Sequence, residues 1–182
     1  MPEISVATSD TLDPAWGHLL PLHLGPVSPA VPPAWHVILL RADRPMLRCD
    51  VHRDPERDLV VSHSEALLWS GVLAVGYGRT CHFIDIERLT VHPLALDGDA
   101  FDYFMGFHPQ EGDLLIASGT DLRRLGRDLG LIWRAADIAV DGVCVGAIEG
   151  GVIYGDGERD PPGGWVPFAV DWATGAVLAD GT

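Results

Sequence analysis

The sequence predicts an all-β fold built from repeated antiparallel β-meander units. Three stretches of the chain can be laid under one another, beginning at Val72, Leu114 and Val143. Each opens with a short apolar run, breaks at glycine and closes with an apolar strand, a polar turn and a second apolar strand. Similarity at a period of tens of residues is typical of a supersecondary unit that cannot bury its apolar face alone. We therefore expect either a partial propeller-like arrangement or a sandwich or barrel.

The closing tails of the units match one another best. They span residues 84–91, 125–132 and 170–177. Gly-Asp turns separate apolar runs at the spacing of roughly 8–12 residues that is typical of antiparallel β domains. The segment nearest to a helical pattern contains Gly126 and Gly130, and each glycine costs about 1 kcal/mol in a helix. The tails therefore predict a strand, a turn and a strand.

Residues 1–34 are predicted to form an irregular, Pro-rich arm. Prolines recur between positions 14 and 33 too densely for a continuous helix or a central strand. Apolar residues such as Trp16 and Leu19 indicate that the arm packs on the body of the protein. The remaining residues, 35–182, are expected to form a single all-β repeat domain, because a chain of 182 residues suits one domain.

Several local elements are expected before the repeat takes over at position 68. They are a first buried strand at 35–40, its neighbour at 46–51, a short strand at 58–62 and one helical turn at 64–69. Trp69, Trp133 and Phe168 occupy apolar ends of the repeat units, so we expect all of them in the core.

The segment FAVDWATGAVL, from Phe168 to Leu178, has a further pattern: a strand, an aspartate, a turn, Thr-Gly and a second strand. LRRLGRDLGLIW, from Leu122 to Trp133, follows it more loosely. These tails resemble the repeat of quinoprotein-type (PQQ-type) β-propellers, and the resemblance implies a meander geometry for each unit. Three recognisable units, and four at most, are too few for the ring that holds the cofactor in that family. We therefore carry over no cofactor site and expect no cofactor.

An incomplete ring leaves sheet edges exposed. Proteins cover such edges with loops, charge or another subunit. The arm of residues 1–34 is the candidate cover within the chain. The other candidate cover is a second copy of the chain, in a homodimer formed through the exposed edges. A further functional hypothesis is therefore that the protein is an assembly subunit that pairs with its own copies.

The strongest compositional bias is the formal net charge of −14. Such a field repels phosphate backbones and anionic membranes and favours cationic partners, so we expect no nucleic-acid or membrane binding. All 12 basic residues are arginine, and the chain contains no lysine. Schiff-base chemistry and P-loop chemistry, which need a lysine, are therefore excluded.

The cysteines Cys49, Cys81 and Cys144 are far apart and form no C-x-x-C motif. Neither a disulfide framework nor a thiolate zinc site is indicated, which suits a reducing cytoplasm. The first residues lack the apolar region of a signal peptide, and no apolar run approaches the ~20 residues that span a bilayer. The lack of lysine and asparagine is typical of a GC-rich genome, and we expect a cytoplasmic bacterial protein.

One insertion interrupts the third unit. The segment GDGERDPPGG, residues 155–164, has counterparts of only a few residues in the other units. Loops of this kind carry function on repeated scaffolds. Its carboxylates alternate along the chain, with an arginine among them and aromatic residues at both ends. The candidate binding residues are Tyr154, Asp156, Glu158, Arg159, Asp160 and Trp165.

This loop has more than one interpretation. Its carboxylates could bind an arginine or lysine of a partner, or ligate Ca²⁺, or belong to an ordinary solvated hairpin held by Pro161-Pro162. A second acidic segment, with Asp97, Asp99 and Asp102, resembles the start of a calcium loop but lacks its glycine and its glutamate. We interpret it as a turn and assign no metal site.

All eight histidines lie between residues 18 and 108. A His-rich half can house an acid–base or metal centre. No H-E-x-x-H motif occurs, and His82 shares one strand face with Ile84 and Ile86, where a core histidine is the ordinary explanation. Nucleophile-elbow and dinucleotide motifs are also absent from the sequence, so we assign no catalytic residue.

These observations predict a non-catalytic acidic binding protein that recognises a basic protein partner. Bacterial immunity proteins, which inhibit basic toxins, share its size and acidity. The alternative is a small enzyme or small-molecule-binding protein whose pocket is lined by residues of the His-rich N-terminal half. An exposed acidic surface with aromatic residues would favour the first hypothesis, and a concave pocket where titratable groups converge would favour the second.

Overall fold

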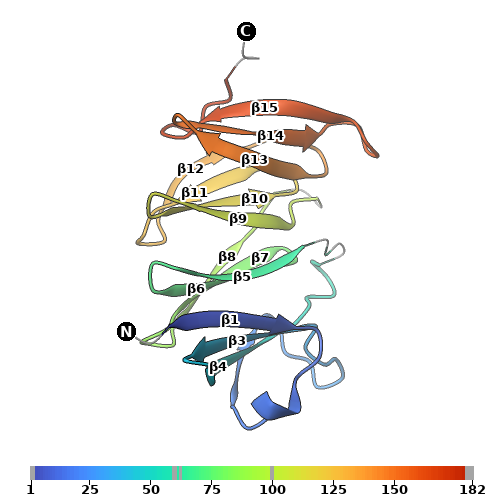
Figure 1. Ribbon diagram of the computed structural model, residues 1–182. Coiled ribbons are helices and arrows are strands. Elements are labelled where there is room, and N and C mark those ends of the chain that lie inside the picture. The colour runs from blue at the N-terminus through green and yellow to red at the C-terminus, as the bar shows by residue number, and fades with distance from the viewer. Residues whose placement is uncertain (1–2, 59–60, 62, 99–100, 179–182) are drawn as a thin grey trace.

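The computed structural model describes residues 3–58, 61, 63–98 and 101–178. The described residues form 15 strands and one 3₁₀ turn, and they contain no α-helix. The strands form four sheets that follow one another along the chain and stack from the N-terminal to the C-terminal end (Figure 1). The predicted all-β repeat fold is therefore confirmed. No helix in the described part of the chain is long and apolar enough to cross a membrane.

The first sheet contains four strands in the spatial order β1-β3-β4-β2. Their bounds are β1 Ile4–Ser9, β2 Pro21–Leu24, β3 Trp35–Arg41 and β4 Arg44–Val51. The strands predicted at 35–40 and 46–51 are thus β3 and β4. β1 pairs antiparallel with β3, and β2 pairs parallel with β4.

The prediction of an irregular arm at residues 1–34 was wrong, because this segment supplies β1 and β2 to the first sheet. Pro21 is tolerated since it is the first residue of an edge strand, where no ladder hydrogen bond is lost. The other prolines of the segment that the structure describes lie outside these two strands. The dense prolines therefore indicate irregular connections between the strands, and not an irregular conformation over the whole segment.

The second and third sheets are simple meanders of four strands each. Their bounds are β5 Ser64–Trp69, β6 Val72–Tyr77, β7 Thr80–Asp85 and β8 Val91–Ala95, then β9 Phe104–Gln110, β10 Asp113–Ser118, β11 Leu122–Leu125 and β12 Leu131–Ala135. The helical turn predicted at 64–69 is β5. Ser70 and Gly71 both have positive φ, which suits the two-residue hairpin turn that pairs β5 with β6. The short strand predicted at 58–62 falls mainly on residues 59, 60 and 62, which lie outside the described residues.

The fourth sheet has three strands, β13 Val143–Glu149, β14 Val152–Glu158 and β15 Trp165–Asp171. A single bridge between Val170 and Val177 stands where the other sheets have a fourth strand. The third sequence unit therefore begins one strand too early. Its opening residue, Val143, lies on the first strand of its sheet, whereas Val72 and Leu114 lie on the second strand of theirs.

Two of the predicted tails, those at residues 84–91 and 170–177, have the same turn conformation. The carbonyl oxygens of Asp85 and Asp171 each accept a hydrogen bond of 2.8 Å from the amide four residues on, at Leu89 and Gly175. Both of these residues have positive φ, 54° and 74°. The carboxylates of Asp85 and Asp171 each accept further amide hydrogen bonds within the turn. One aspartate-capped turn thus recurs in two sheets, which confirms the internal repeat.

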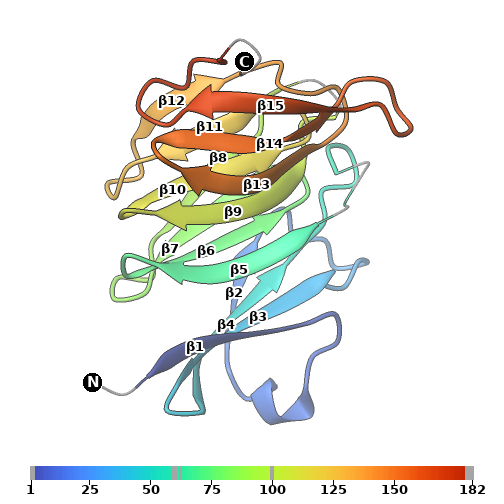
Figure 2. The same cartoon turned by 45° about the horizontal axis from the view of Figure 1, so that its top comes forward.

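Three apolar clusters fill the spaces between successive sheets. Strands β1, β5, β9 and β13 lie one above another along one side of the stack (Figure 2). Trp69 and Trp133 are buried in these clusters, as predicted, and Phe168 is half-buried against the same cluster as Trp133. The first and fourth sheets lie at opposite ends of the stack, so the propeller-like ring is open (Figure 1).

The N-terminal end of the stack is covered by the chain itself. Ile38 lies on the face of β3 that is turned away from the second sheet, yet its side chain is fully buried. The connection between β1 and β2, with its 3₁₀ turn at Pro14–Trp16, lies beside this face (Figure 1). Arg48 of β4 donates to the carbonyl oxygen of Leu19 in this connection, at 3.5 Å.

Candidate binding surface on the last sheet

The outer face of the fourth sheet has no such cover. Val143, Ile153 and Val170 point toward the third sheet and are at most 1% exposed. Their neighbours along the strands point the other way, because side chains of a strand alternate between its two faces. The exposed residues of this outer face, which we call the open face, include Cys144, Tyr154, Asp156, Trp165 and Pro167.

Cross-strand pairing brings these residues together. Asp156 of β14 lies directly opposite Cys144 on one side and Pro167 on the other. Directly opposed residues project on the same side of a sheet, so these three form one row. Tyr154 follows in the next row and is 48% exposed. Burial, with the nearby charge of Asp156, raises the pKa of the Cys144 thiol, as expected for neighbours on one face.

Trp165 lies at the end of the open face. Its indole packs over Gly142, where a Cβ atom would stand 3.0 Å from the ring, and the side chain remains 43% exposed. Gly142 has a φ of +147° and therefore suits this close approach. One side of the aromatic ring is therefore fixed against Gly142, and the other side is exposed to solvent. A side chain held in this way can act as a rigid contact residue for a partner.

Glu158 behaves differently from the other candidate residues. It lies opposite Trp165 in the β14–β15 pairing but is only 9% exposed. Its carboxylate accepts a hydrogen bond from the backbone amide of Gly163. The interpretation of Glu158 as a partner-facing carboxylate is therefore corrected: this side chain stabilises the hairpin loop of its own chain.

The predicted insertion is shorter than residues 155–164, because β14 and β15 extend through Glu158 and Trp165. The loop proper covers the six residues 159–164, against two at 78–79 and three at 119–121 in the corresponding hairpins. Arg159 and Asp160 lie in it, both exposed, and the loop is closed by hydrogen bonds between the backbones of residues 159, 160 and 164. Within the described chain, neither side chain is tied down by a hydrogen bond or an ion pair.

The structure thus brings Tyr154, Asp156 and Trp165 onto one face and places Arg159 and Asp160 in the adjoining loop. Sequence reasoning missed Cys144 and Pro167. Strand alternation would have identified both, since Cys144 follows the apolar residue Val143 and Pro167 stands two residues after Trp165 on the same strand.

The β15 edge of this sheet is partly blocked. Ala169 and Asp171 use their backbones on the outer side of β15, where they bond the segment that follows the strand. Pro167 has the same parity, so its nitrogen, which carries no hydrogen, faces the edge. Proline at this position weakens the edge as a template for another strand. A partner therefore finds a better surface on the open face than along the edge.

The second acidic segment has a structural role in its described part. Asp97 is exposed and lies 3.4 Å from Arg57, and Asp99 lies outside the described residues. Asp102 is fully buried and accepts hydrogen bonds of 2.7 Å from the amide of Gly98 and from Arg123. These contacts agree with its interpretation as a turn.

Asp102 belongs to a buried ion cluster. The guanidinium of Arg123, which is 4% exposed, also contacts Asp121 at 3.2 Å, and Asp121 pairs in turn with Arg134. Burial alone would raise the pKa of Asp102, but the hydrogen bonds and charge of Arg123 and the hydrogen bond from Ser118 lower it overall. The cluster is therefore charged inside the protein.

Three histidines in or next to the first sheet, His23, His36 and His52, make side-chain contacts. His23 Nδ1 lies 2.9 Å from His52 Nε2, and His36 Nδ1 lies 2.8 Å from a carboxylate oxygen of Asp50. Arg48 holds the same carboxylate through two hydrogen bonds of 2.6 and 2.8 Å. Within the described residues, no group of three or more His, Cys, Asp or Glu side chains is arranged to hold a metal ion.

His82 gives a pH-dependent prediction. Burial lowers its pKa from 6.5 to about 4, and its Nδ1 atom is buried without a hydrogen-bond partner among the described residues. The unfolded chain therefore binds a proton more readily than the folded one, and the stabilisation present above pH 6.5 is lost as the pH falls toward 4. We expect the free energy of unfolding to drop by on the order of 2 kcal/mol more between pH 7 and pH 4.5 in the native protein than in His82→Leu.

Urea unfolding at the two pH values measures this difference. His92→Leu is the matched control, because His92 is exposed on the neighbouring strand β8 and should keep the native pH dependence. An equal loss of stability in His82→Leu and in the native protein would show that His82 does not carry the effect.

No protein-family model matches the sequence, and no curated protein matches it. Among solved structures, the WD40 domain of Pan2 from Neurospora crassa is similar, with a TM-score of 0.50 and 10% sequence identity. The likeness covers 65% of this chain but only 37% of that chain, so the protein spans little more than a third of the WD40 domain's length. At this identity the likeness shows the fold alone, a propeller-like arrangement of β-sheets.

Proposed function

We propose that the protein is a non-catalytic acidic binding protein that recognises a basic protein partner through the open face. The observation that carries this proposal is that Tyr154, Asp156 and Trp165 share an uncovered face at one end of the stack. The residues of the adjoining loop, Arg159 and Asp160, extend the same surface.

The chemistry of this surface suits a basic protein. Tryptophan and tyrosine are among the residues that contribute most to binding energy at protein interfaces. Here Trp165 is held over Gly142, so little conformational freedom is lost when a partner covers it. The carboxylates of Asp156 and Asp160 can accept charge-assisted hydrogen bonds from arginine or lysine. A net charge of −14 also speeds the approach of a cationic partner.

The difference between the two ends of the stack supports an external partner. Terminal units of stacked repeats need a cover or a polar outer face. The first sheet is covered by the connection between β1 and β2, whereas the open face exposes aromatic rings. A second copy docked face to face would bring two chains of charge −14 together, so a basic partner suits the surface better than a self-dimer.

We propose further details on the same basis. An immunity-type inhibitor of a basic toxin would use such a surface to cover the cationic site of its target. The three cysteines are all unpaired, which suits the proposed cytoplasmic location. The aspartate-capped turn at Asp171 with Gly175 at positive φ supports kinship with quinoprotein-type repeats in particular.

The partner can be captured with a cross-linker attached to an exposed cysteine of the protein. Cys144 is exposed on the open face, whereas Cys49 and Cys81 are buried, so a photo-cross-linker attached through maleimide reacts at Cys144 alone. We expect it to capture one basic protein from a lysate of the source cells. The control is Cys144→Ser combined with Leu20→Cys, which carries the linker at a position that is 92% exposed in the connection covering the first sheet. Capture of the same protein from both positions would contradict the proposed surface.

Removing charge from the open face then tests recognition. Asp156→Asn with Asp160→Asn should weaken binding of the captured protein at least about tenfold at low salt, and less at high salt, because exposed charges are screened. Stability should change by no more than about 0.5 kcal/mol, since both side chains are exposed and neither is hydrogen-bonded within the described residues. Glu87→Gln with Glu111→Gln removes two carboxylates from distant turns and should leave the affinity unchanged. Equal weakening by both double variants would mean that only net charge matters.

A further inference from the structure

A cavity of about 710 Å³ lies at the other end of the stack from the open face. It is bounded by two connections, residues 26–31 before β3 and residues 52–56 after β4. Its volume falls within the range of roughly 300–1,000 Å³ that is usual for small-molecule sites. The proposed function does not use this cavity.

The base of the cavity is preformed. His52 lies there with only 6% of its surface exposed, and its Nε2 atom is bonded to His23 Nδ1 at 2.9 Å. The amide of His52 donates to the carbonyl oxygen of Leu24 at 2.7 Å. Gly25 follows with a φ of +89°, and a Cβ atom there would stand 2.6 Å from the carbonyl oxygen of His52. Glycine is therefore required where the two connections meet, and the junction is fixed before any ligand arrives.

One wall of the cavity is apolar. It consists of Pro26, Val27, Val31 and Pro55. Val27 and Val31 are 57% and 50% exposed, although valine gains free energy when it is buried. These side chains offer a contact surface for the apolar part of a ligand.

The connection that follows β4 adds two acidic residues to the lining. Asp54 and Glu56 line the cavity. One oxygen of the Asp54 carboxylate accepts from the amide of Glu56 at 3.0 Å, which fixes the side chain, while the other oxygen accepts no hydrogen bond from the described residues. Arg53 also lines the cavity, but its guanidinium donates two hydrogen bonds to the carbonyl oxygen of Asp58, at 2.9 and 2.8 Å. Two carboxylates against one engaged guanidinium make the lining negative.

We propose that this cavity binds a small organic cation, an amine with an apolar body. The ammonium group meets Asp54 and Glu56, and the apolar body lies against Pro26, Val27 and Val31. A charge-assisted hydrogen bond to each carboxylate and the burial of apolar surface together provide the affinity. Burial, with the charge of the nearby His23, lowers the pKa of His52, so the imidazole at the base is neutral near pH 7 and does not repel the cation.

Two other ligand classes suit the cavity less well. Anions would face a lining with two carboxylates and one guanidinium, which is negative overall, in a protein of net charge −14. A metal ion would need a set of ligands that the described residues do not assemble at any point. The apolar side chains of the lining also carry no atom that could ligate a metal ion.

The test uses three probes of similar shape, with phenethylamine as the cation, 2-phenylethanol as the neutral match and 3-phenylpropionate as the anionic match. Titrations are followed by calorimetry and by the NMR signals of the His52 ring at pH 7. We expect saturable binding of phenethylamine with a Kd of about 1 mM or tighter, a shift of the His52 signals, and binding of the other two probes at least about tenfold weaker.

Variants then locate the ammonium group. Asp54→Asn with Glu56→Gln should weaken phenethylamine binding about tenfold. The amide side chain introduced at position 54 retains an oxygen that can accept from the backbone amide of residue 56, so the loop should keep its conformation. The matched control is again Glu87→Gln with Glu111→Gln, which should bind the amine as the native protein does.

Three outcomes would each overturn the proposal. They are equal binding of the amine and the alcohol, an unchanged affinity in the double variant of Asp54 and Glu56, and no saturation at about 10 mM. Since Asp156 and Asp160 take no part, this result is independent of the partner proposed for the open face.

Discussion

Replacing Arg123 by methionine is expected to lower the free energy of unfolding by about 3–5 kcal/mol, because it leaves the buried carboxylate of Asp102 without its counter-charge. Arg123 donates to Asp102 at 2.7 Å and to Asp121 at 3.2 Å, and these carboxylates are 0% and 1% exposed. Asp121 keeps its contact with Arg134 in the variant, whereas the donors left to Asp102 among the described residues are the amide of Gly98 and the hydroxyl of Ser118. Urea unfolding at pH 7 measures the loss.

The same cluster offers a sharper test than the single variant. Asp102→Asn removes the stranded charge, so the double variant Asp102→Asn with Arg123→Met should be less destabilised than the sum of the two single variants. Arg88→Met is the surface control, since the Arg88–Asp85 pair is a solvent-exposed contact between residues three apart. If the two single losses simply add, the ion pair does not couple these side chains.

The sequence was sufficient for those features that depend on neighbouring residues. An aspartate at the end of a strand, followed by a residue with positive φ, specifies the turns at Asp85 and Asp171 within a few residues. The strand alternation that buries Ile153 and exposes Tyr154 and Asp156 is equally local. The repeat and most of the candidate surface were therefore predictable.

Features that depend on distant segments were not predictable in this way. β2 forms only by pairing with β4, whose residues lie 27 positions further along the chain, as in the pair Leu22–Cys49. The register of the third unit was missed because the fourth sheet replaces its last strand by one bridge. Glu158 shares the parity of Asp156, but its carboxylate turns back to the amide of Gly163, a contact that only the folded loop reveals.

The cavity beside the first sheet is another product of tertiary structure. The sequence indicated a concentration of histidines, and the alternative hypothesis placed a pocket among them. The junction of Gly25 with His52, which sets the base of the cavity, requires β2 to lie beside β4. Since that pairing was not foreseen, the lining residues could not be chosen from the sequence.

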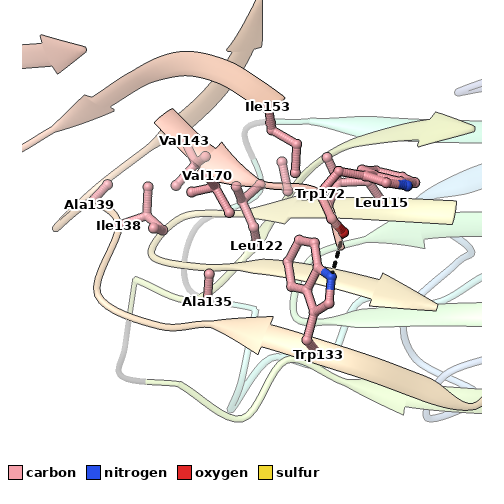
Figure 3. Packing of buried hydrophobic residues seen from close by; sticks show 11 residues of the cluster. Leu115, Leu122, Trp133, Ala135, Ile138, Ala139, Val143, Ile153, Val170 and Trp172 are labelled. Atoms are coloured by element: carbon pink, nitrogen blue, oxygen red, sulfur yellow. Dashed lines mark hydrogen bonds between the residues drawn. The ribbon is translucent and has the colours of Figure 1, made fainter. Parts of the chain in front are cut away.

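Replacing Trp133 by alanine should cost about 3–5 kcal/mol of unfolding free energy, the range of large-to-small changes in a core. The ring is 8% exposed, and its Nε1 atom donates to the carbonyl oxygen of Trp172 at 2.9 Å (Figure 3). Gly175, with positive φ, comes so close that a Cβ atom there would stand 2.7 Å from the ring. The side chain therefore joins the third sheet to the turn that ends the fourth, and its loss leaves a cavity and removes a hydrogen bond to the Trp172 carbonyl.

Trp165→Ala is the matched change on the open face. Its ring packs over Gly142 but stays 43% exposed, so we expect a stability loss of about 1 kcal/mol or less together with weaker binding of the captured partner. Trp133→Ala should show the reverse pattern at a temperature where it remains folded, with a large loss of stability and an unchanged affinity. Denaturant melts and calorimetric titrations on both variants separate the two roles. If Trp133→Ala weakened binding as strongly as Trp165→Ala while folded, the open face would depend on the packing between the sheets, and recognition could not be assigned to its exposed residues alone.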